Sequence, residues 1–452
     1  MPKRKLTKPI SGAEYARRRR ELMALMEENS IAILPSANEK VRNGDVPYRF
    51  RQDSDFQYLT GFNEPESVIV LIPGREHGEA LLFCRDRDDE HEKWHGPIIG
   101  LDRAKQFIGV DDAFPISDID DILPGLIEGR SKLYSAMGSD SDFDHQIFEW
   151  VDKISESGHL GASPPGEFVQ LEQYLHELRL YKSAAEIELM RRAAQASALG
   201  HVRAMEVVRP GMMEYELEAE LRYAFSRSGA RDEAYPSIVG GGENACVMHY
   251  IENNQMLRDG DLVLVDAGCE FEGYASDLTR TYPINGRFSA EQKAVYEVVL
   301  KAQEAAIDAV QPGNTWDEPH DAAMWEITKG LIALGILKGD LEVLFEDEAY
   351  LPYCMHKTGH WLGLDVHDVG DYQVNDEWRV LEPGMVTTIE PGLYFDASIE
   401  SLPVAYRGIG VRIEDDVLVT KSGHDVLTDA APKTVREIEA LMQNELEVRS
   451  HG

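Results

Sequence analysis

The sequence has few cysteines, and those that it has lie far apart. Cys84, Cys246, Cys269 and Cys354 are the four cysteines among 452 residues, and no two of them form a CxxC pair. Such spacing argues against a structural zinc site and against a disulfide framework. It also fits a reducing compartment, where thiols stay unpaired. We therefore expect a cytoplasmic protein.

Long apolar runs and positive charge are scarce as well. No run approaches the roughly 20 apolar residues that cross a bilayer, and the basic N-terminus lacks the apolar segment of a secretory signal. Lys and Arg number 45 against 81 Asp and Glu, which gives a formal net charge of −36. A nucleic-acid-binding protein needs a basic face. We expect neither a membrane nor a nucleic acid as partner.

Several common catalytic signatures are absent. The sequence contains neither a GxSxG nucleophile elbow nor a GxxxxGK[ST] phosphate loop, which argues against serine hydrolases of that type and against P-loop enzymes. An HExxH pattern does occur at residues 91–95, but charged residues surround it and Gly96 and Pro97 follow it directly. We expect no buried helix there, and therefore no zinc-peptidase site of this type.

The first half of the chain alternates strand-like and helical segments. Apolar runs at residues 31–36, 67–74 and 79–86 indicate strands, and residues 15–29 indicate a helix ahead of them. A polar stretch with Gly and Pro, residues 155–168, then interrupts the pattern. Because linkers between domains have such a composition, this stretch is the best candidate for a domain boundary.

Long helices lie between hairpins in the second half. Ser183 and Glu186 have capping-box spacing, so a helix is expected to start there and to end before Pro210. A second helical block ends in the same way before a later proline. The pattern predicts an α+β fold, with a smaller N-terminal α/β domain over residues 1–174 and a C-terminal domain over residues 175–452.

Two aspartates stand where a hairpin would normally have apolar residues. Asp266 ends the run "LVLVD", and Asp277 follows a turn signal in a second strand-like run. If the turn centres near Phe271 and Glu272, the two aspartates face each other directly across the hairpin. Like charges at that spacing, about 5 Å between Cβ atoms, repel. A buried pair must share a proton or a cation; two exposed aspartates near a turn explain the stretch equally well.

Further candidate ligands lie downstream. The segment "MHKTGHWLGLDVHDVG" contains His356, His360 and His367 among glycines and apolar residues, a setting that favours an irregular loop or a short strand. Three histidines in such a segment favour metal binding or catalysis over a single core histidine. Glu390 and Glu414 each stand at the end of a strand-like run, either as exposed strand ends or as buried acids.

Five of these residues form an oxygen-rich set with one imidazole: Asp266, Asp277, His360, Glu390 and Glu414. Four carboxylates carry too much charge for one divalent ion but suit two. Two ions about 4 Å apart can activate a water molecule and polarise a carbonyl together. The set therefore predicts a hydrolase that uses Mn²⁺ or a similarly hard ion.

These residues resemble the pita-bread metallopeptidase family, which includes methionine aminopeptidase, prolidase and aminopeptidase P. The motifs "HWLGLDVHDVG", "TIEPGLY" and "RIEDDVLVT" are most similar to the Xaa-Pro aminopeptidase branch, and "YRFRQDSDFQYLTGFNEPESVIVL" resembles the N-terminal domain of that branch. The resemblance implies a pita-bread C-terminal domain. It also implies a metalloaminopeptidase with two divalent ions per subunit, most simply Mn²⁺, that releases the first residue of peptides with proline second.

The resemblance also implies roles for the ligands. Asp266 would bind one ion, His360 and Glu390 the other, and Asp277 and Glu414 would bridge the two. Glu390 would in addition take a proton from water as the general base. The physical requirements agree, because a carboxylate can deprotonate a water whose pKa has been lowered toward neutrality.

Other positions match residues around the ions in the family. His249 and His367 would stabilise the tetrahedral intermediate or orient the scissile carbonyl, and His356 would line the proline side of the cleft. Pocket and substrate-binding positions are matched by Tyr235, Arg412, Tyr394 and Trp94. Arg412 would orient Asp266, and Trp94 would be lent to a neighbouring subunit, although the flanking "WHGPIIG" departs from the family pattern. We accordingly expect a homo-oligomer, either a dimer or a tetramer.

Two other functions remain open on the sequence. A prolidase has the same chemistry but hydrolyses only Xaa-Pro dipeptides, so the dependence of turnover on peptide length separates it from an aminopeptidase. A non-catalytic peptide-binding protein on the same fold would have no use for a complete set of ligands and histidines. The presence of all these residues argues against it.

Overall fold

The computed structural model describes residues 10–450, and the chain divides into two compact units, Met1–Arg179 and Leu180–Gly452. The boundary expected after residue 174 falls inside helix α7 (Glu172–Leu180). The polar stretch at residues 155–168 leads into β8 (Glu167–Gln170), which belongs to the sheet of the first unit. That stretch is therefore a loop within one domain. A polar loop and a linker have the same composition, so the composition alone did not separate them.

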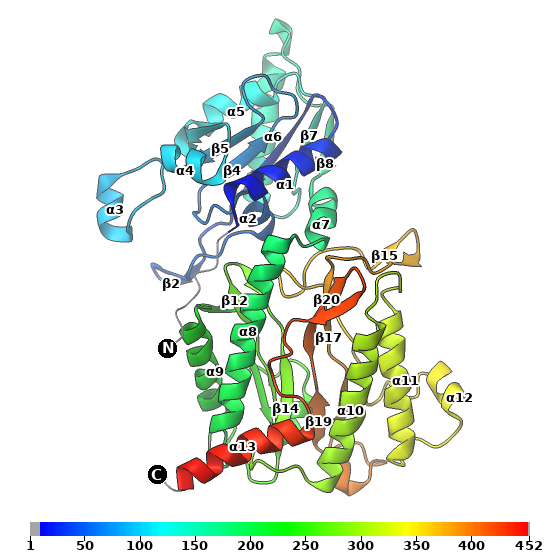
Figure 1. The fold of residues 1–452 in the computed structure, drawn as a ribbon. Helices are drawn as coiled ribbons and strands as arrows, with labels where there is room; N and C mark the ends of the chain where they lie inside the picture. The colour runs from blue at the N-terminus through cyan, green and yellow to red at the C-terminus, as the bar shows by residue number, and fades with distance from the viewer. Residues whose placement is uncertain (1–9, 451–452) are drawn as a thin grey trace. The chain divides into compact units, whose positions relative to one another are not determined.

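The first unit is built on a six-stranded mixed sheet (Figure 1). In spatial order its strands are β6 (Asp112–Pro115), β5 (Ala80–Cys84), β4 (Val68–Leu71), β1 (Ser30–Pro35), β7 (Lys132–Ser135) and β8. Its helices are α1 (Gly12–Leu25), α2 (Ser54–Thr60), α3 (Asp89–His95), α4 (Leu101–Ile108), α5 (Ile119–Ile127) and α6 (Ser141–Glu156), and a small hairpin joins β2 (Val41–Asn43) to β3 (Val46–Pro47). Side chains of α5 and α6 pack on the central strands to form the core. The expected helix and three strands are thus confirmed.

The HExxH pattern lies in α3, a short helix at the surface. Asp88 caps its N-terminus by accepting a hydrogen bond from the Glu90 amide. The carboxylate of Glu92 is engaged by the guanidinium of Arg87, at 2.8 Å from Nε and 2.6 Å from Nη2. Trp94 is 81% exposed. The residues do form a helix, but it is an exposed one whose glutamate is already paired.

The second unit holds small sheets between two pairs of packed helices (Figure 1). The helices are α8 (Ala184–Val207), α9 (Glu214–Ser228), α10 (Ala290–Ala309), α11 (Glu318–Ala333), α12 (Leu341–Glu346) and α13 (Val435–Ser450). The strands of its first half are β9 (Asp232–Glu233), β10 (Ile238–Gly241), β11 (Leu262–Asp266), β12 (Cys269–Phe271), β13 (Tyr274–Ala275) and β14 (Thr279–Pro283). Those of its second half are β15 (Gln373–Val374), β16 (Glu377–Trp378), β17 (Val386–Ile389), β18 (Gly392–Phe395), β19 (Ile409–Arg412), β20 (Asp415–Thr420) and β21 (Gly423–Val426).

The helix starts and the strands agree with the α+β prediction. Ser183 and Glu186 form the expected capping box at the start of α8, each side chain bonding to the backbone of the other. The helix ends at Val207, before Pro210. The segment with the three histidines, residues 355–370, is irregular. Among the residues that the structure describes, no helix is long and apolar enough to cross a membrane.

The turn of the aspartate hairpin lies one residue later than expected. Its central residues are Glu272 and Gly273, with φ of 52° and 88°, as a type I′ turn requires. Phe271 is therefore a strand residue that pairs with Tyr274, and it is not one of the two central turn residues. A turn centred on Phe271 and Glu272 would place the positive φ on a bulky aromatic residue, whereas glycine adopts it without a steric cost.

The later turn changes which residue faces Asp266. Its cross-strand partner is Thr279, not Asp277. Asp277 lies in the short irregular stretch between β13 and β14. The predicted direct pairing of the two aspartates is therefore wrong. The two aspartates are nevertheless close to each other, since the Tyr235 hydroxyl contacts both carboxylates.

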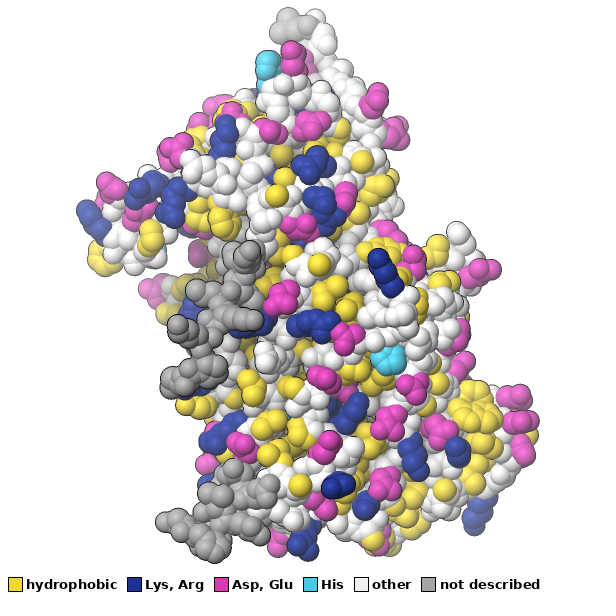
Figure 2. Space-filling model, viewed as in Figure 1, with side chains coloured by type: hydrophobic (Ala, Val, Ile, Leu, Met, Phe, Trp, Pro, Cys, Tyr) yellow, Lys and Arg dark blue, Asp and Glu magenta, His cyan; other side chains and the backbone are white. Residues whose placement is uncertain are grey.

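Charged side chains of both signs cover the visible surface. On the face drawn in Figure 2, Lys and Arg side chains are scattered among Asp and Glu and do not gather into one basic area. This distribution accompanies the net charge of −36.

Candidate metal centre

The five predicted ligands lie at strand ends and in loops of the second unit. Asp266 is the last residue of β11, and Asp277 lies two positions before Thr279, the first residue of β14. Glu390 follows β17 directly, and Glu414 lies between β19 and β20. His360 belongs to the irregular segment that pairs by hydrogen bonds with the residues before Glu390. Four separate segments of chain thus bring their donors to one place.

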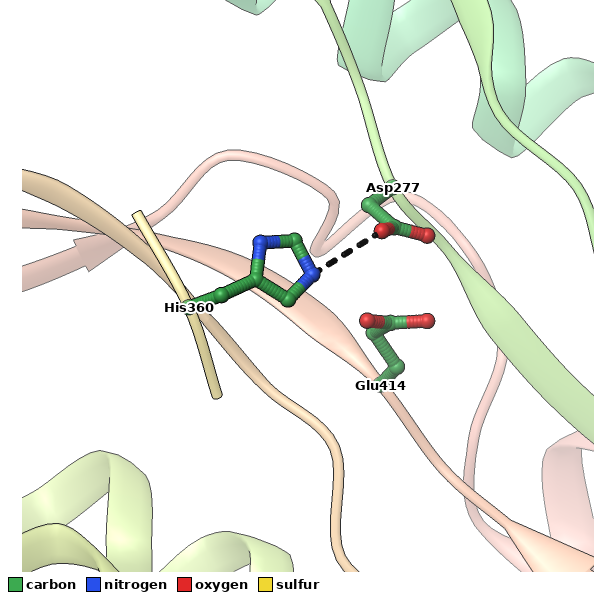
Figure 3. Close-up of side chains that lie close together, drawn as sticks. All are labelled: Asp277, His360 and Glu414. Atoms are coloured by element: carbon green, nitrogen blue, oxygen red, sulfur yellow. Dashed lines mark ion pairs between the residues drawn. The ribbon is translucent and has the colours of Figure 1, made fainter. Parts of the chain in front are cut away.

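Asp277, His360 and Glu414 form the centre of the cluster (Figure 3). One donor atom from each lies within 4.8 Å of the other two. His360 Nε2 lies 3.3 Å from Asp277 Oδ2 and 3.7 Å from Glu390 Oε1. Figure 3 shows the imidazole pointing at the Asp277 carboxylate, with the Glu414 carboxylate beside it. Four of the five predicted ligands therefore converge directly.

Tyr235 connects Asp266, the fifth ligand, to this group. The Tyr235 hydroxyl lies 2.7 Å from Asp266 Oδ1 and 2.5 Å from Asp277 Oδ1. A hydroxyl has one proton and can donate to only one carboxylate at a time. The two aspartates therefore lie on one side of the hairpin and share a single donor between two acceptors.

The cluster contains more buried negative charge than its own cations balance. Glu414 is 1% exposed, and burial raises its pKa well above the ordinary value. Burial likewise raises the pKa of Asp266, and raises that of Glu390 to about 7. Burial opposes ionisation of Asp277 as well, but its bond to His360 outweighs this and lowers the Asp277 pKa. Divalent cations would balance this charge, so the donor set fits the two ions implied by the resemblance.

Backbone groups fix the orientation of His360. Its Nδ1 lies 2.9 Å from the carbonyl oxygen of Trp361, which can only accept, so Nδ1 carries a proton. Nε2 then faces the carboxylates. Burial lowers the pKa of His360, but the nearby Asp277 and Glu390 carboxylates outweigh burial and raise it to about 9. The Thr388 hydroxyl accepts from the His360 amide at 3.1 Å. This is the usual way in which a protein presents an imidazole to a metal.

Two threonines hold the glutamates. The Glu390 amide donates to the Thr358 carbonyl at 2.7 Å. The Thr279 hydroxyl donates to Glu414 Oε2 at 2.6 Å. The second contact involves a side chain that the sequence reasoning missed. Its signal was present, because Thr279 lies two residues beyond Asp277 and so falls on the same side of the strand.

Arg412 and Tyr394 form a chain of hydrogen bonds from Asp266 to His356. Arg412 donates from Nη2 to Asp266 Oδ2 at 2.7 Å and from Nη1 to the Tyr394 oxygen at 2.9 Å. Tyr394 in turn donates to His356 Nε2 at 2.8 Å, because His356 Nδ1 donates to the carbonyl of Lys357. Burial lowers the pKa of His356 to about 4, so its imidazole is neutral at pH 7. Three predicted residues are thus joined to one predicted ligand.

The other predicted residues lie outside this chain. His367 is exposed, and its ring stands edge-on to that of His360 with centroids 4.4 Å apart. Burial and the neighbouring His360 lower the pKa of His367. His249 is exposed and close enough for its charge to lower the pKa of His356. Trp94 lies in α3 of the first unit and is exposed.

A layer of buried charge behind the ligands was also missed. The Asp416 carboxylate accepts from the Asp277 amide at 3.1 Å, and burial raises the Asp416 pKa well above its ordinary value. Asp415 is buried and accepts from Arg280 at 2.8 Å and from Lys433 at 2.8 Å. Arg280 and Lys433 lie far from Asp415 in the sequence, so no local pattern could have identified them.

Comparisons with known proteins agree over both units. Residues 188–421 match the pattern of Metallopeptidase family M24, and residues 15–134 match Aminopeptidase P, N-terminal domain. The chain is 45% identical over 434 residues to the Xaa-Pro aminopeptidase of Escherichia coli, which covers 96% of this chain and 98% of that protein.

Solved structures show the same relationship. The structure of Pseudomonas aeruginosa aminopeptidase PepP superimposes with a TM-score of 0.96 at 58% identity, over 97% of this chain and 99% of that one. A zinc-substituted Escherichia coli aminopeptidase P in complex with product gives a TM-score of 0.94 at 44% identity, over 97% and 99% of the two chains. The chain therefore belongs to metallopeptidase family M24, with an N-terminal domain of the aminopeptidase P type and a C-terminal pita-bread domain that binds divalent metal.

Proposed function

We propose that the protein is an Xaa-Pro aminopeptidase, which releases the N-terminal residue from peptides that have proline at the second position. The observation that supports this most is the convergence of three buried carboxylates, the partly buried Glu390 and His360, linked through Arg412 and Tyr394 to a neutral His356. The named relatives, which align over nearly the whole chain, support the same reaction.

The ligand set defines what the metal would do. Asp266 would bind one ion, His360 and Glu390 the other, and Asp277 and Glu414 both. When bound, two such ions supply Lewis-acid activation of water and polarisation of the scissile carbonyl. The individual ligand assignments are part of the proposal.

Glu390 is proposed as the general base. It accepts a proton from the water that attacks the scissile carbonyl, and it then delivers that proton to the leaving nitrogen. The delivery is essential for this substrate, because the nitrogen of an Xaa-Pro bond is tertiary and has no proton of its own.

The histidines are proposed to act on the substrate. His249 and His367 are exposed beside the cluster and would donate to the developing oxyanion. His356 would line the proline side of the cleft, together with Tyr235, Tyr394 and Arg412. His356 Nε2 accepts a hydrogen bond from the Tyr394 hydroxyl, so the imidazole is held in one tautomer and one orientation.

Peptide length decides between this function and a prolidase. A dipeptide Xaa-Pro and a tripeptide Xaa-Pro-Xaa with the same first residue are compared by kcat/KM. An aminopeptidase hydrolyses the tripeptide at least as well as the dipeptide. Turnover confined to the dipeptide would establish a prolidase. No metal-dependent hydrolysis of either peptide would favour a non-catalytic peptide-binding protein.

We further propose the metal, the compartment and the assembly. Mn²⁺ is proposed because the donors are four hard carboxylate oxygens and one imidazole. Cytoplasmic residence is proposed because all four cysteines are free thiols. A homo-oligomer, dimer or tetramer, is proposed from the role that the resemblance gives to Trp94, whose exposure leaves it able to contact another subunit.

A further inference from the structure

The second unit has a cavity of about 430 Å³ beside the end of β17, lined by Thr387, Thr388 and Ile389. Its walls come from the start of α11, from residues 357–359, from the β15–β16 hairpin and from β17. None of the five predicted ligands lines it. The volume is within the range of small-molecule sites in proteins, about 300–1,000 Å³.

The lining of this cavity is mainly aromatic and aliphatic. Trp316, Tyr372 and Trp378 supply three aromatic rings, and Leu381 and Ile389 supply aliphatic surface. Of these rings, Trp316 and Tyr372 contact each other, with centroids 4.6 Å apart. A planar aromatic molecule would extend this cluster by stacked or edge-on contacts.

The polar groups of the cavity favour an uncharged occupant. Asp317 and Lys357 line it with opposite charges that offset one another. His320 Nδ1 lies 2.7 Å from the Thr358 hydroxyl, whereas Nε2 has no hydrogen-bond partner among the residues that the structure describes. Burial lowers the pKa of His320 to about 4, so the ring is neutral and offers one hydrogen-bonding nitrogen. We propose that this cavity binds a small, uncharged aromatic molecule that carries one hydrogen-bonding group.

The cavity wall is continuous with the supports of the predicted ligands. Thr358 lines the cavity, and its carbonyl accepts from the Glu390 amide at 2.7 Å. Thr388 also lines it, and its hydroxyl accepts from the His360 amide at 3.1 Å. A ligand in the cavity therefore touches the two residues that position the proposed base and the histidine.

The aromatic cluster gives a second connection. The ring of Trp316 lies 4.2 Å, centroid to centroid, from the ring of Trp361. The carbonyl of Trp361 in turn fixes Nδ1 of His360. Occupancy of the cavity is thus coupled to the metal centre and modulates turnover; this second part of the inference rests on the proposed function, whereas the binding site itself does not.

Calorimetric titration of the full-length, Mn²⁺-loaded protein with indole tests the binding site. Indole is a bicyclic ring with one N–H donor, and we expect saturable binding at one site per chain. Indole-3-acetate and tryptamine keep the ring but add a negative or a positive charge, and both should bind more weakly. Absence of saturable indole binding, or equal binding of all three compounds, would overturn the site.

Three tryptophan variants locate the bound indole. Trp378→Ala removes an aromatic wall at a position that is 38% exposed, so the fold should tolerate it, and Trp316→Ala removes a second wall. Each should weaken indole binding by about threefold to tenfold, the range expected for one aromatic contact. Trp325→Ala is the matched control, because Trp325 lies on the same α11 but packs on Phe345 away from the cavity. An equal loss in Trp325→Ala, or no loss in Trp378→Ala, would contradict the assignment.

Kinetics and metal binding test the coupling. Saturating indole should change kcat/KM for an Xaa-Pro tripeptide, or the affinity for Mn²⁺, by at least about twofold, the lower end of measured couplings. Trp378→Ala should shift that response to indole concentrations about threefold to tenfold higher, in parallel with its weaker binding. Binding without either change would overturn the coupling. If the protein hydrolyses no Xaa-Pro peptide, the proposed function is wrong. Indole binding then still tests the cavity site, and the effect of indole on Mn²⁺ affinity still tests its coupling to the metal centre.

Discussion

Arg412 connects the predicted ligand Asp266 to Tyr394 and, through Tyr394, to His356 by hydrogen bonds. Its guanidinium is 4% exposed and donates from separate nitrogens to the Asp266 carboxylate and to the Tyr394 hydroxyl. Burial disfavours its charge, but Tyr394 and Asp266 outweigh burial and raise the Arg412 pKa well above its ordinary value. A single planar group thus fixes a predicted metal ligand and, through Tyr394, the ring of His356.

Replacing Arg412 by lysine tests this geometry while keeping the charge. A lysine ammonium cannot reach both partners in the fixed fork of a guanidinium. We expect Arg412→Lys to lower kcat/KM and Mn²⁺ affinity by about 10-fold to 100-fold, the usual effect of losing a partner of a metal ligand. Arg407→Lys is the control, because Arg407 donates only to backbone carbonyls of Leu402 and Glu400. Equal effects of the two substitutions would contradict the role of Arg412.

His201 makes the stability of the second unit depend on pH. It is fully buried in α8 and donates from Nε2 to the Ala267 carbonyl at 2.9 Å. Burial lowers its pKa from 6.5 to about 4. At pH values between about 4 and 6.5, His201 is protonated in the unfolded chain and neutral in the folded chain. The contribution of neutral His201 is therefore complete above pH 6.5 and is lost as the pH falls toward 4.

Urea unfolding of the metal-free protein at pH 7 and pH 5 measures this effect. We expect the free energy of unfolding to fall with pH, with His201 accounting for about 2 kcal/mol of the decrease. In His201→Gln the decrease should be smaller by that amount. The exposed His145 provides the control, since His145→Gln should leave the pH dependence as it is in the unchanged protein. An identical slope in His201→Gln would refute the linkage.

At the scale of elements, the hairpin between β11 and β14 sets the position of Asp277. The type I′ turn at Glu272 and Gly273 decides the register, and the register places Thr279 opposite Asp266. Asp277 then lies outside the paired strands, and its amide donates a hydrogen bond to the Asp416 carboxylate. The turn thus determines where a predicted bridging ligand lies.

Substitution of Gly273 tests the importance of the turn. A Cβ at a φ of 88° is strained, so Gly273→Ala should lower the free energy of unfolding by about 1 kcal/mol. Gly125→Ala serves as the contrast, because Gly125 lies inside α5 with open space around its Cα. There alanine should stabilise the chain by about 1 kcal/mol. Denaturant unfolding measures both, and a neutral Gly273→Ala would show that the turn is not constrained.

The sequence predicted most elements because their signals are local. The capping box of Ser183 and Glu186 identified the start of α8, and apolar runs identified β1, β4 and β5. The predicted cross-strand partner of Asp266 was two residues too early. An error of one residue in the position of a turn shifts every cross-strand partner by two residues. The boundary expected after residue 174 lies inside α7, shortly before the division after Arg179, whereas the polar stretch before β8 is a loop with the composition of a linker.

The ligands were identified for a different reason. A buried acid at a strand end is unusual in any local window, so Asp266, Glu390 and Glu414 stood out. The buried Asp415 behind them was not predicted to form ion pairs, because its partners Arg280 and Lys433 reach it only through the tertiary fold. The cavity lined by Trp316 and His320 could not be predicted either, since its walls come from four separate segments.

At the scale of the whole molecule, the two units divide the matched family patterns between them. The aminopeptidase P pattern lies in Met1–Arg179, and the M24 pattern lies in Leu180–Gly452 with all five predicted ligands. Acidic side chains dominate the composition, with 81 Asp and Glu. The predicted metal centre thus gathers four carboxylates within one unit of an already acidic protein. Bound cations are needed to balance this negative charge.

A titration of the metal-free protein with Mn²⁺ tests that central claim most directly. Bound metal and the release of the first residue from an Xaa-Pro-Xaa tripeptide are measured in the same samples. We expect no release without metal, and a rate of release that rises as each chain binds two ions. An intact peptide at full metal loading, or the same rate in the presence of a chelator, would contradict it.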